Sequence, residues 1–562
     1  MKKILTLFAC LSFTFCLSIQ EARAQSGMVT PTTQFWNTDV TVEVNTMANQ
    51  RHVRIAAGYN GWVYAAYIVN DSVSHKGGVV VRYSKDGGVT WMPFNNYPYY
   101  DHSFYNACDI VAEGLDSAHS NVFVAMSRKD LITKKFEVEV LRFNPYHIAY
   151  PSVPVFFKQL DSNQVFNLAL ASDFRNPVAR DSVYSMGLLY NHHGPMMDSL
   201  FFATTEKKLD SVNVHGSVSK GGNFFRAPRL ISTAKHLRGL GLSYSYSATS
   251  VRGTFHAVWE SLDTTTSKFG HVLASRTALR TDSAWTKPVY IDSMNVAFRD
   301  GIRNPTIASQ SSILDNDSTN ATTLVAFEWA KGGNPDSLDL YGFINKRADT
   351  TEYWNQYGIA GSVHKEMQPD LSFDPFNKQF LLTYFDSTAQ SLIYETLPMA
   401  APAPFGFSVV SGQYNVTTSN LVAPWPQVII NPKLYAPSPA VQQPFFAWVS
   451  DPANKNGVVK CNGQYLNVGI QEIELAGMQV LNPFPNPASD QVSLPVVSNR
   501  ETDLNLSILN LLGENVIVSR QIHLTEGMQM IDLNVANLSS GLYFCRLESG
   551  KSSKTVRIVV QH

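Results

Sequence analysis

Seven pairs of short apolar segments recur along this chain of 562 residues. In each pair, an apolar segment leads into a turn rich in Gly, Asn, Asp or Ser, and a second apolar segment ends near an aromatic residue. The first pair is Arg54–Ala57 and Val63–Tyr67, with Asn60 and Gly61 in the turn. The others are Asp109–Ala112 with Val122–Ala125, Leu168–Ala171 with Ser185–Leu188, Ser245–Ala248 with Thr254–Trp259, Pro305–Ala308 with Leu324–Phe327, Pro369–Ser372 with Gln379–Tyr384, and Pro426–Val428 with Phe445–Trp448.

The spacing of these pairs, about 55 to 75 residues, is close to the period of a propeller blade. Small residues occupy matching places, which suits strands that crowd around a central channel: Ala56, Ala112, Ala248 and Ala308. We therefore predict an all-β chain in which residues 30–455 form a β-propeller of six or seven blades. Two β-sandwiches are the alternative, but they do not explain one motif that recurs this regularly.

The pattern of apolar residues changes near residue 478. Residues 456–477 are expected to hold the last propeller strands and a linker. Alternating apolar residues then mark short strands, as in Leu504, Leu506 and Ile508, or Val556, Ile558 and Val560. Residues 478–562 are therefore predicted to form a small, Ig-like β-sandwich.

The N-terminus has the three parts of a secretion signal. Lys2 and Lys3 are followed by the apolar run Ile4–Ile19 and by small residues before Gln25, so residues 1–24 are predicted to be removed. A membrane anchor is the alternative. Because the run is short and interrupted by Ser and Thr, and no later run is longer, we expect no transmembrane segment.

Charge and cysteine content exclude several kinds of site. The net charge is -1, which gives nucleic acid no basic surface to bind. The cysteines that would remain after signal removal are Cys108, Cys461 and Cys545, far apart and without metal-ligand spacing. Two interpretations of these cysteines remain, namely buried free thiols and one disulfide. We expect no metal and no cofactor.

Three blocks near the C-terminus form an ordered motif: Pro485-Asn486-Pro487, then Leu512-Gly513-Glu514, then Gly541-Leu542-Tyr543 followed by Lys554. Residues 478–562 thereby resemble the C-terminal sorting domain of the type IX secretion system of Bacteroidetes. The resemblance implies export to the periplasm, passage across the outer membrane by the type IX machinery, and then release or surface anchoring. It also implies that the domain is removed after export. An ordinary Ig-like binding module is the alternative.

A second resemblance concerns the propeller. The segment Tyr83–Trp91 contains Ser84, Asp86, Gly88 and Trp91 in the pattern of an Asp-box, so this region resembles sialidase-like propellers. The box is structural: its Asp accepts backbone hydrogen bonds in the turn and its Trp packs between blades. A weaker copy follows at residues 217–224.

Sialidase-like catalysis would need three arginines, a Tyr/Glu pair and an acid. Candidate residues near strand ends are Arg54, Arg175, Arg303, Glu260 and Glu328. The strand containing Arg54 lacks the proline found in that family, and the candidates assemble into no site. Exposed salt bridges are the favoured interpretation, so the catalytic residues stay unknown.

Two adjacent histidines, His192 and His193, fall in a predicted loop. They have no second ligand pair at metal spacing, so we interpret them as part of a surface turn.

The triplet Asp-Ser/Thr followed by a residue such as Ala, Val, Leu or Met is overrepresented, since chance gives roughly two or three copies. It resembles the O-glycosylation acceptor of Bacteroidetes, which would place sugars on loops. Turn formation by Asp-Ser and Asp-Thr is an equally open interpretation. The acceptors would be Ser72, Ser117, Ser182, Ser199, Ser211, Thr264, Ser283, Ser293, Ser318, Ser337, Thr350 and Ser387.

The sequence thus predicts a secreted or surface-anchored propeller that binds a glycan or a protein, without a catalytic set. Two alternatives remain. One is a glycoside hydrolase or lyase that acts on extracellular glycans, and the other is a surface scaffold or adhesion protein.

Overall fold

The chain divides into two compact units, residues 1–466 and 467–562. The predicted signal, residues 1–24, lies outside the described residues. The structure is a computed structural model, which describes residues 39–562 except 44–48, 59–60, 72–75, 95–98, 114–120, 144–151, 161–163, 166, 173–185, 206–224, 246–253, 263–269, 278–283, 293–300, 311–320, 331–332, 349, 360–363, 376–377, 400–412, 416–420, 422–423, 432–442, 451–456, 464–477, 481–482, 484–485, 499–500, 512, 526 and 550–551.

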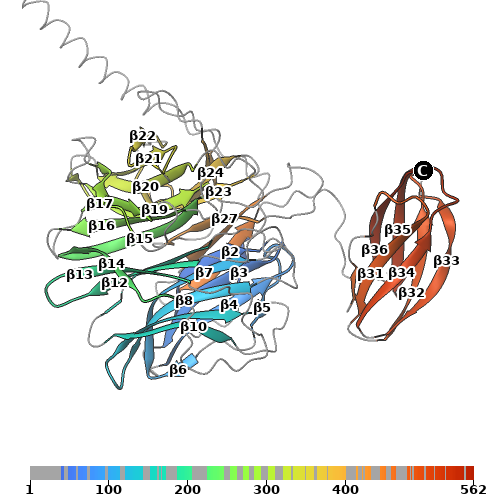
Figure 1. Ribbon diagram of the computed structural model, residues 1–562, viewed down its shortest axis with the longest axis horizontal. Coiled ribbons are helices and arrows are strands. Elements are labelled where there is room, and N and C mark those ends of the chain that lie inside the picture. The colour runs from blue at the N-terminus through green and yellow to red at the C-terminus, as the bar shows by residue number, and fades with distance from the viewer. Residues whose placement is uncertain are drawn as a thin grey trace, which may run out of the picture. The chain divides into compact units, whose positions relative to one another are not determined.

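Antiparallel sheets build the first unit, and its described residues form seven of them (Figure 1). Strands that follow one another in sequence are hydrogen-bonded neighbours in these sheets, except that β6 pairs with β4 and that β1 pairs with β29. Blade 1 contains β2 (Asn49–Ala57), β3 (Val63–Asp71), β4 (Lys76–Ser84), β5 (Met92–Pro93) and β6 (Tyr99–Asp101). Blade 2 contains β7 (Ser103–Glu113), β8 (Asn121–Asp130), β9 (Phe136–Phe143) and β10 (Val153–Leu160). Blade 3 contains β11 (Leu168–Ser172), β12 (Met186–His193), β13 (Asp198–Thr204) and β14 (Arg229–Ala234).

The remaining blades follow the same plan. Blade 4 contains β15 (His236–Ser245), β16 (Thr254–Leu262), β17 (His271–Arg276) and β18 (Val289–Tyr290). Blade 5 contains β19 (Ile302–Ser309), β20 (Thr323–Ala330), β21 (Leu338–Asn345) and β22 (Asn355–Tyr357). Blade 6 contains β23 (Glu366–Asp374), β24 (Gln379–Asp386), β25 (Ser391–Pro398) and β26 (Gln413–Asn415). Blade 7 contains β27 (Gln427–Asn431), β28 (Gln443–Ser450), β29 (Val458–Gly463) and β1 (Val40–Thr41).

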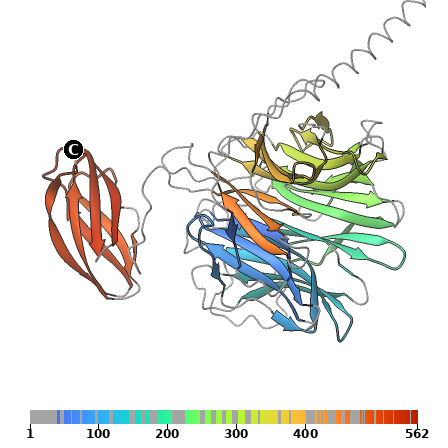
Figure 2. The ribbon, with the colours of Figure 1, turned by 180° about the vertical axis from the view of Figure 1, so that it is seen from behind.

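The first strand of each blade lies on the inside of a closed ring. Strands β2, β7, β11, β15, β19, β23 and β27 contact one another in this order, and β27 contacts β2 again. Figures 1 and 2 show β27, in orange, beside the blue strand β2 from both sides. This closed ring is a β-propeller, so the predicted fold class is confirmed, and the described sheets agree with the larger of the two predicted blade numbers.

Blade 7 combines strands from both ends of the propeller. Its outer strand β1 pairs with β29, with Val40 opposite Cys461. Closing the ring in this way holds the N-terminal strand and the last strands of the propeller in one sheet.

Most of the predicted strand pairs coincide with the first two strands of a blade, but the fourth was misplaced. Its first strand, β15, ends at Ser245 rather than beginning there. The segment from Tyr246 to Ala248 lies outside the described residues. Ala56, Ala112 and Ala308 do line the central channel, as their small size suggested.

Four inner strands begin with the same irregularity. A residue with positive φ, namely His52, Gly239, Asn304 or Gln368, precedes or interrupts the regular pairing with the next strand. At these points the register shifts in β2, β15, β19 and β23. Such bulges redirect side chains in the first half of an inner strand.

The second unit is a sandwich of two antiparallel sheets. Its core is formed by the predicted alternating residues, including Leu504, Leu506, Ile508 and Ile558. One sheet contains β30 (Met478–Val480), β31 (Gln491–Ser498) and β34 (Gly527–Asn534). The other contains β33 (Asn515–Leu524), β32 (Thr502–Leu509), β35 (Gly541–Ser549) and β36 (Ser552–Val560).

Cys108, Cys461 and Cys545 are buried free thiols. Burial raises the pKa of Cys461 and of Cys545 to about 12, so both are protonated and unreactive at neutral pH. Among the residues that the structure describes, no helix combines the length and the apolar character that crossing a bilayer requires.

Candidate functional site

The seven inner strands enclose a cavity of about 250 Å³ on the axis of the propeller. All seven contribute to its wall, mostly with apolar or small side chains such as Ile55, Leu170 and Leu371. A concave, largely apolar site with a few polar groups at its rim is the usual form of a small-ligand site.

Three charged side chains stand directly before wall residues on three inner strands. They are Arg54 on β2, Asp109 on β7 and Asp370 on β23, and we call this group the channel mouth. Arg54 Nε lies 3.9 Å from Asp109 Oδ1. The charge of Arg54 also acts on Asp370, although blade 7 separates their blades, so the three groups converge on the same end of the channel.

Backbone hydrogen bonds hold the two carboxylates in place. Leu170 N–H donates to Asp109 Oδ2 over 2.7 Å, and Val428 N–H donates to Asp370 Oδ2 over 2.8 Å. Each aspartate therefore also connects the inner strands of two neighbouring blades.

Burial changes the acidity of this pair. It raises the pKa of Asp370 to about 7, although the Val428 N–H and the charge of Arg54 act in the opposite direction. Burial likewise raises the pKa of Asp109, against Arg54. At neutral pH the channel mouth can therefore hold a proton on a carboxyl group, next to a fixed positive charge.

An exposed aromatic residue lies at the start of the seventh inner strand. Trp425 precedes β27, has a φ of 46° and exposes 46% of its surface. Its backbone N–H donates to Gln368 Oε1 over 2.9 Å, which ties it to the start of β23 in blade 6. An indole in this place offers a flat apolar face to a ligand.

The other arginine and glutamate candidates form pairs within blades. Arg303 binds Glu328 between β19 and β20, and Arg238 binds Glu260 between β15 and β16 with N···O distances of 2.7 and 2.8 Å. The expectation of exposed glutamates is wrong, because both are fully buried. Arg175 lies outside the described residues.

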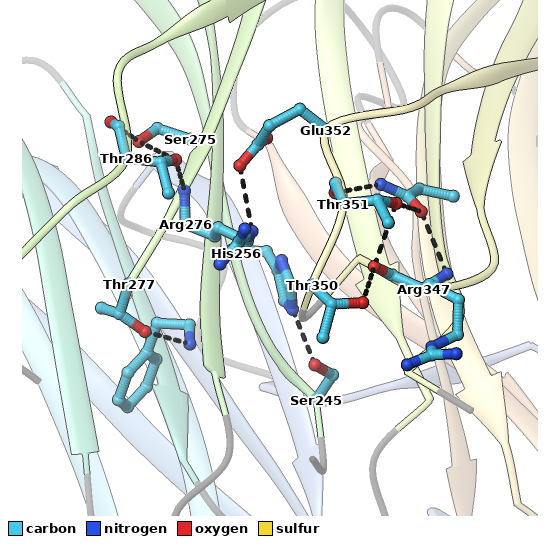
Figure 3. Close-up of polar contacts among 12 residues, drawn as sticks. Ser245, His256, Ser275, Arg276, Thr277, Thr286, Arg347, Thr350, Thr351 and Glu352 are labelled. Carbon is cyan, nitrogen blue, oxygen red and sulfur yellow. Dashed lines mark hydrogen bonds and ion pairs between the residues drawn. The ribbon is translucent and has the colours of Figure 1, made fainter. Parts of the chain in front are cut away.

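A second polar cluster lies between blades 4 and 5 (Figure 3). Ser245 Oγ is 2.7 Å from His256 Nε2, and Arg276 Nε is 3.0 Å from Glu352 Oε1. Burial, together with the charge of Arg276, lowers the pKa of His256 to about 3. The adjoining cavity holds about 10 Å³, which is room for one water at most. This Ser–His pair is therefore a packing contact; no motif in the sequence pointed to it.

The histidine pair was also misplaced by sequence reasoning. His192 and His193 are the last residues of β12, not part of a loop. His192 packs against Phe201, with ring centroids 6.0 Å apart.

The Asp-box segment forms a hydrogen-bonded hairpin. Ser84 Oγ donates to Asp86 Oδ1 over 2.7 Å and accepts the Gly88 N–H. Asp86 accepts the N–H and the hydroxyl of Thr90, at 2.9 and 2.6 Å. Trp91 Nε1 donates to the Gly88 carbonyl over 3.1 Å. The weaker copy at residues 217–224 lies outside the described residues.

Four of the predicted glycosylation acceptors are described. Ser337, Thr350 and Ser387 lie in bends or turns, whereas Ser199 lies within β13. The other acceptors lie outside the described part of the chain: Ser72, Ser117, Ser182, Ser211, Thr264, Ser283, Ser293 and Ser318.

The sorting-motif residues occupy turns and edges of the sandwich. Asn486 accepts the Val559 N–H over 2.7 Å and so fixes the chain beside β36. Gly513 has a φ of 81° between β32 and β33, and Tyr543 donates to the Ser539 carbonyl over 2.8 Å. Pro487 follows Asn486 in the same turn, Lys554 lies opposite Leu547, and Gly541 begins β35; Pro485 lies outside the described residues.

Comparison with solved structures gives only remote similarities to the propeller. A protein of unknown function from Dyadobacter fermentans DSM 18053 is 10% identical over 76% of this chain and 98% of that chain, with a TM-score of 0.41. The α-L-arabinofuranosidase Arb93A of Fusarium graminearum is 10% identical over 77% and 98%, with a TM-score of 0.42. The α-L-arabinanase of Penicillium chrysogenum is 11% identical over 65% and 99%, with a TM-score of 0.37. None of these similarities assigns an activity.

Comparison by sequence identifies the second unit. No curated protein matches the chain significantly. The family model described as "Secretion system C-terminal sorting domain" matches residues 482–561, which is the part that the three motif blocks singled out. This chain therefore carries a C-terminal sorting domain and is a cargo of the type IX secretion system, exported to the cell surface or the extracellular space.

Proposed function

We propose that the exported propeller binds an extracellular glycan at its channel mouth. The observation that carries the proposal is the convergence of Arg54, Asp109 and Asp370, from three blades, directly beside the wall of a cavity of about 250 Å³. Charged groups with fixed orientation, placed beside an apolar hollow, provide specificity for a polar ligand. Trp425 adds an exposed aromatic face at the start of the neighbouring inner strand.

The chemistry of the mouth favours a sugar as the ligand. Arg54 donates hydrogen bonds in a planar fork, while the two carboxylates accept them, which matches the mixed donor and acceptor character of vicinal hydroxyl groups. A protein ligand, and with it a role as surface scaffold, would instead engage a wide surface and depend little on this group.

A glycoside hydrolase is the second candidate, and the acidity of Asp370 favours it. A carboxyl with a pKa of about 7 can donate a proton to a leaving group, and a second carboxyl nearby can act as base or nucleophile. Both aspartates accept backbone hydrogen bonds, so each carboxyl group has a fixed orientation in either function.

A glycan array and a parallel turnover assay on the secreted protein test the proposal. We expect binding of at least one class of glycan without release of sugar, and at least tenfold weaker binding by Arg54→Ala. Asp336→Asn is the matched control, because this carboxylate is 87% exposed and does not line the channel. Hydrolysis that is lost in Asp370→Asn would establish the enzyme instead, whereas binding that is equal in Arg54→Ala would reject the channel mouth as the site.

We also propose the maturation of the chain. The signal, residues 1–24, is removed in the periplasm, and the sorting domain, residues 478–562, is removed after export, which leaves the propeller of residues 30–455 with the segment 456–477. Sequencing of both terminal peptides of the secreted protein tests these limits. A mature form that retains residues beyond 478 would contradict the second cleavage.

A further inference from the structure

Two histidines and an aspartate meet at the junction of blades 3 and 4. One ligand atom from each of His193, Asp198 and His236 lies within 4.8 Å of the other two. His193 Nδ1 contacts Asp198 Oδ1, and His236 Nδ1 lies 3.9 Å from Asp198 Oδ2. The imidazole rings have centroids 5.8 Å apart, and each lies near a different oxygen of the carboxylate.

The fold brings these residues together through strand pairing. His193 ends β12 and Asp198 begins β13, and the two are directly opposite each other in the hairpin between these strands. His236 begins β15, the inner strand of the next blade. The cluster thus joins two blades, and its third member is 38 positions beyond the second, counted from 198 to 236.

The carboxylate is positioned while the imidazoles stay accessible. Asp198 is 2% exposed, and its Oδ2 accepts the Leu237 N–H over 2.8 Å. The side chains of His193 and His236 are 39% and 23% exposed, so an ion can reach them from solvent. A hydrogen bond that orients a ligating carboxylate is a usual feature of protein metal sites.

We propose that His193, Asp198 and His236 bind a divalent transition-metal ion of the Zn²⁺ class. Imidazole nitrogen and carboxylate oxygen suit this ion, and bonds of about 2.0–2.2 Å place tetrahedral ligand atoms roughly 3.3–3.6 Å apart. The three candidate ligand atoms lie within 4.8 Å of one another, so small side-chain rotations close the site around an ion. Three protein ligands leave one position of the tetrahedron for water or an external ligand.

Other histidine–aspartate contacts in the propeller lack the third group. His271 Nδ1 lies 2.9 Å from Asp292 Oδ2, and His364 Nδ1 lies 2.7 Å from Asp386 Oδ2. Within the described residues, only the cluster at blades 3 and 4 unites three potential ligands. Each of these pairs is a contact between one histidine and one aspartate, whereas the cluster at blades 3 and 4 supplies the third ligand that a zinc site with three protein ligands needs.

Calorimetric titration of the tag-free, EDTA-treated secreted protein with Zn²⁺ tests the proposal. We expect one Zn²⁺ per chain, and a dissociation constant at least tenfold larger in His236→Ala. His271→Ala is the matched control, because it removes a histidine from a pair that has no third ligand, and it should bind Zn²⁺ as the unmodified protein does. Co²⁺ in place of Zn²⁺ should give a visible absorption band that His193→Ala abolishes.

Two results would overturn the site. One is unmodified protein that binds no Zn²⁺ above the level of the His193→Ala/His236→Ala double variant. The other is a His236→Ala variant that retains both the affinity and the Co²⁺ band. Melting temperatures measured without metal test whether each variant is folded. The side chain of His236 is partly exposed, so its removal should leave the fold intact and a loss of Zn²⁺ binding would report on the site itself.

Discussion

Gln50 accepts a hydrogen bond from the backbone N–H of Val459 over 2.8 Å, although 409 positions separate the two residues. A second bond beside it runs from Gly457 N–H to Asn49 Oδ1 over 3.0 Å. These contacts join β2 of blade 1 to β29 of blade 7. The first and last blades are therefore tied by one buried and one partly buried polar contact, while β1 pairs with β29 within blade 7.

We predict that Gln50→Ala destabilises the propeller by about 1–3 kcal/mol, because a buried N–H would lose its acceptor. Gln50 is 1% exposed, so water cannot replace its side chain without rearrangement. Urea unfolding followed by tryptophan fluorescence measures the change. Gln356→Ala on the exposed face of β22 is the control and should stay within 0.5 kcal/mol, about the usual effect of a surface substitution. Equal stability of the two variants would contradict this role of Gln50.

A second prediction concerns the Asp-box hairpin. Gly88 has a φ of 98°, and a Cβ at this position would overlap the ring of Phe445 in blade 7. Gly61 has a φ of 80° but open space around its Cα. Gly61→Ala should therefore cost only the backbone strain, about 1 kcal/mol, while Gly88→Ala should cost about 1–3 kcal/mol more through the clash. Thermal unfolding of both variants separates the two effects. A Gly88→Ala variant no less stable than Gly61→Ala would show that the hairpin does not pack on blade 7.

Much of the propeller could be predicted because every blade repeats the same local pattern. Short apolar segments next to turn residues predicted the strands around Ile55, Ile110 and Ile307, and small residues predicted the channel wall. The fourth inner strand was misplaced because β15 enters through Gly239 and Gly241, where a bulge breaks the alternation that sequence reasoning follows. A bulge depends on contacts with the next strand, which a local pattern does not contain.

The candidate sites were harder to predict, because their residues come from different blades. Arg54 was singled out, but Asp370 was not, since only closure of the ring brings it near Arg54. His193 was placed in a loop, whereas β12 extends to the histidine itself. The only local sequence signal for this cluster was the short spacing of His193 and Asp198, which flank one turn. Nothing in the sequence around His236 indicated that it would join them.

A third prediction follows from the acidity of Asp370. The pKa of its carboxyl is 3.8 in an unfolded chain, and burial raises it to about 7 in the folded protein. Between about pH 4 and pH 7 the folded protein therefore keeps a proton that the unfolded chain releases, so the stability that Asp370 contributes is lost as the pH rises through this range.

In Asp370→Asn this proton is absent, so the free energy of unfolding should fall less between pH 4.5 and pH 8 than in the unmodified protein. Asparagine keeps an oxygen that can accept the Val428 N–H, which limits other effects. Urea unfolding at both pH values measures the difference. Asp336→Asn, which changes an exposed carboxyl, should leave the pH dependence as it is. The same pH dependence in both variants would mean that Asp370 does not carry this proton.

The last prediction distinguishes the two interpretations of the Asp-Ser/Thr triplets. If they are glycosylation acceptors, sugars should occur on Ser337, Thr350 and Ser387, which lie in bends or turns. Ser199 should carry none, because β13 is paired on both sides, with His192 and Thr233 opposite this residue. A bulky sugar would disturb that pairing, so Ser199 is an internal control with the same local sequence pattern. Peptide mass spectrometry of the protein secreted by its own host measures the occupancy. An intact mass equal to that of the bare polypeptide would leave turn formation as the reason for the triplets. Asp386 shows how such a turn is built, because its side chain accepts the N–H groups of Thr388 and Ala389.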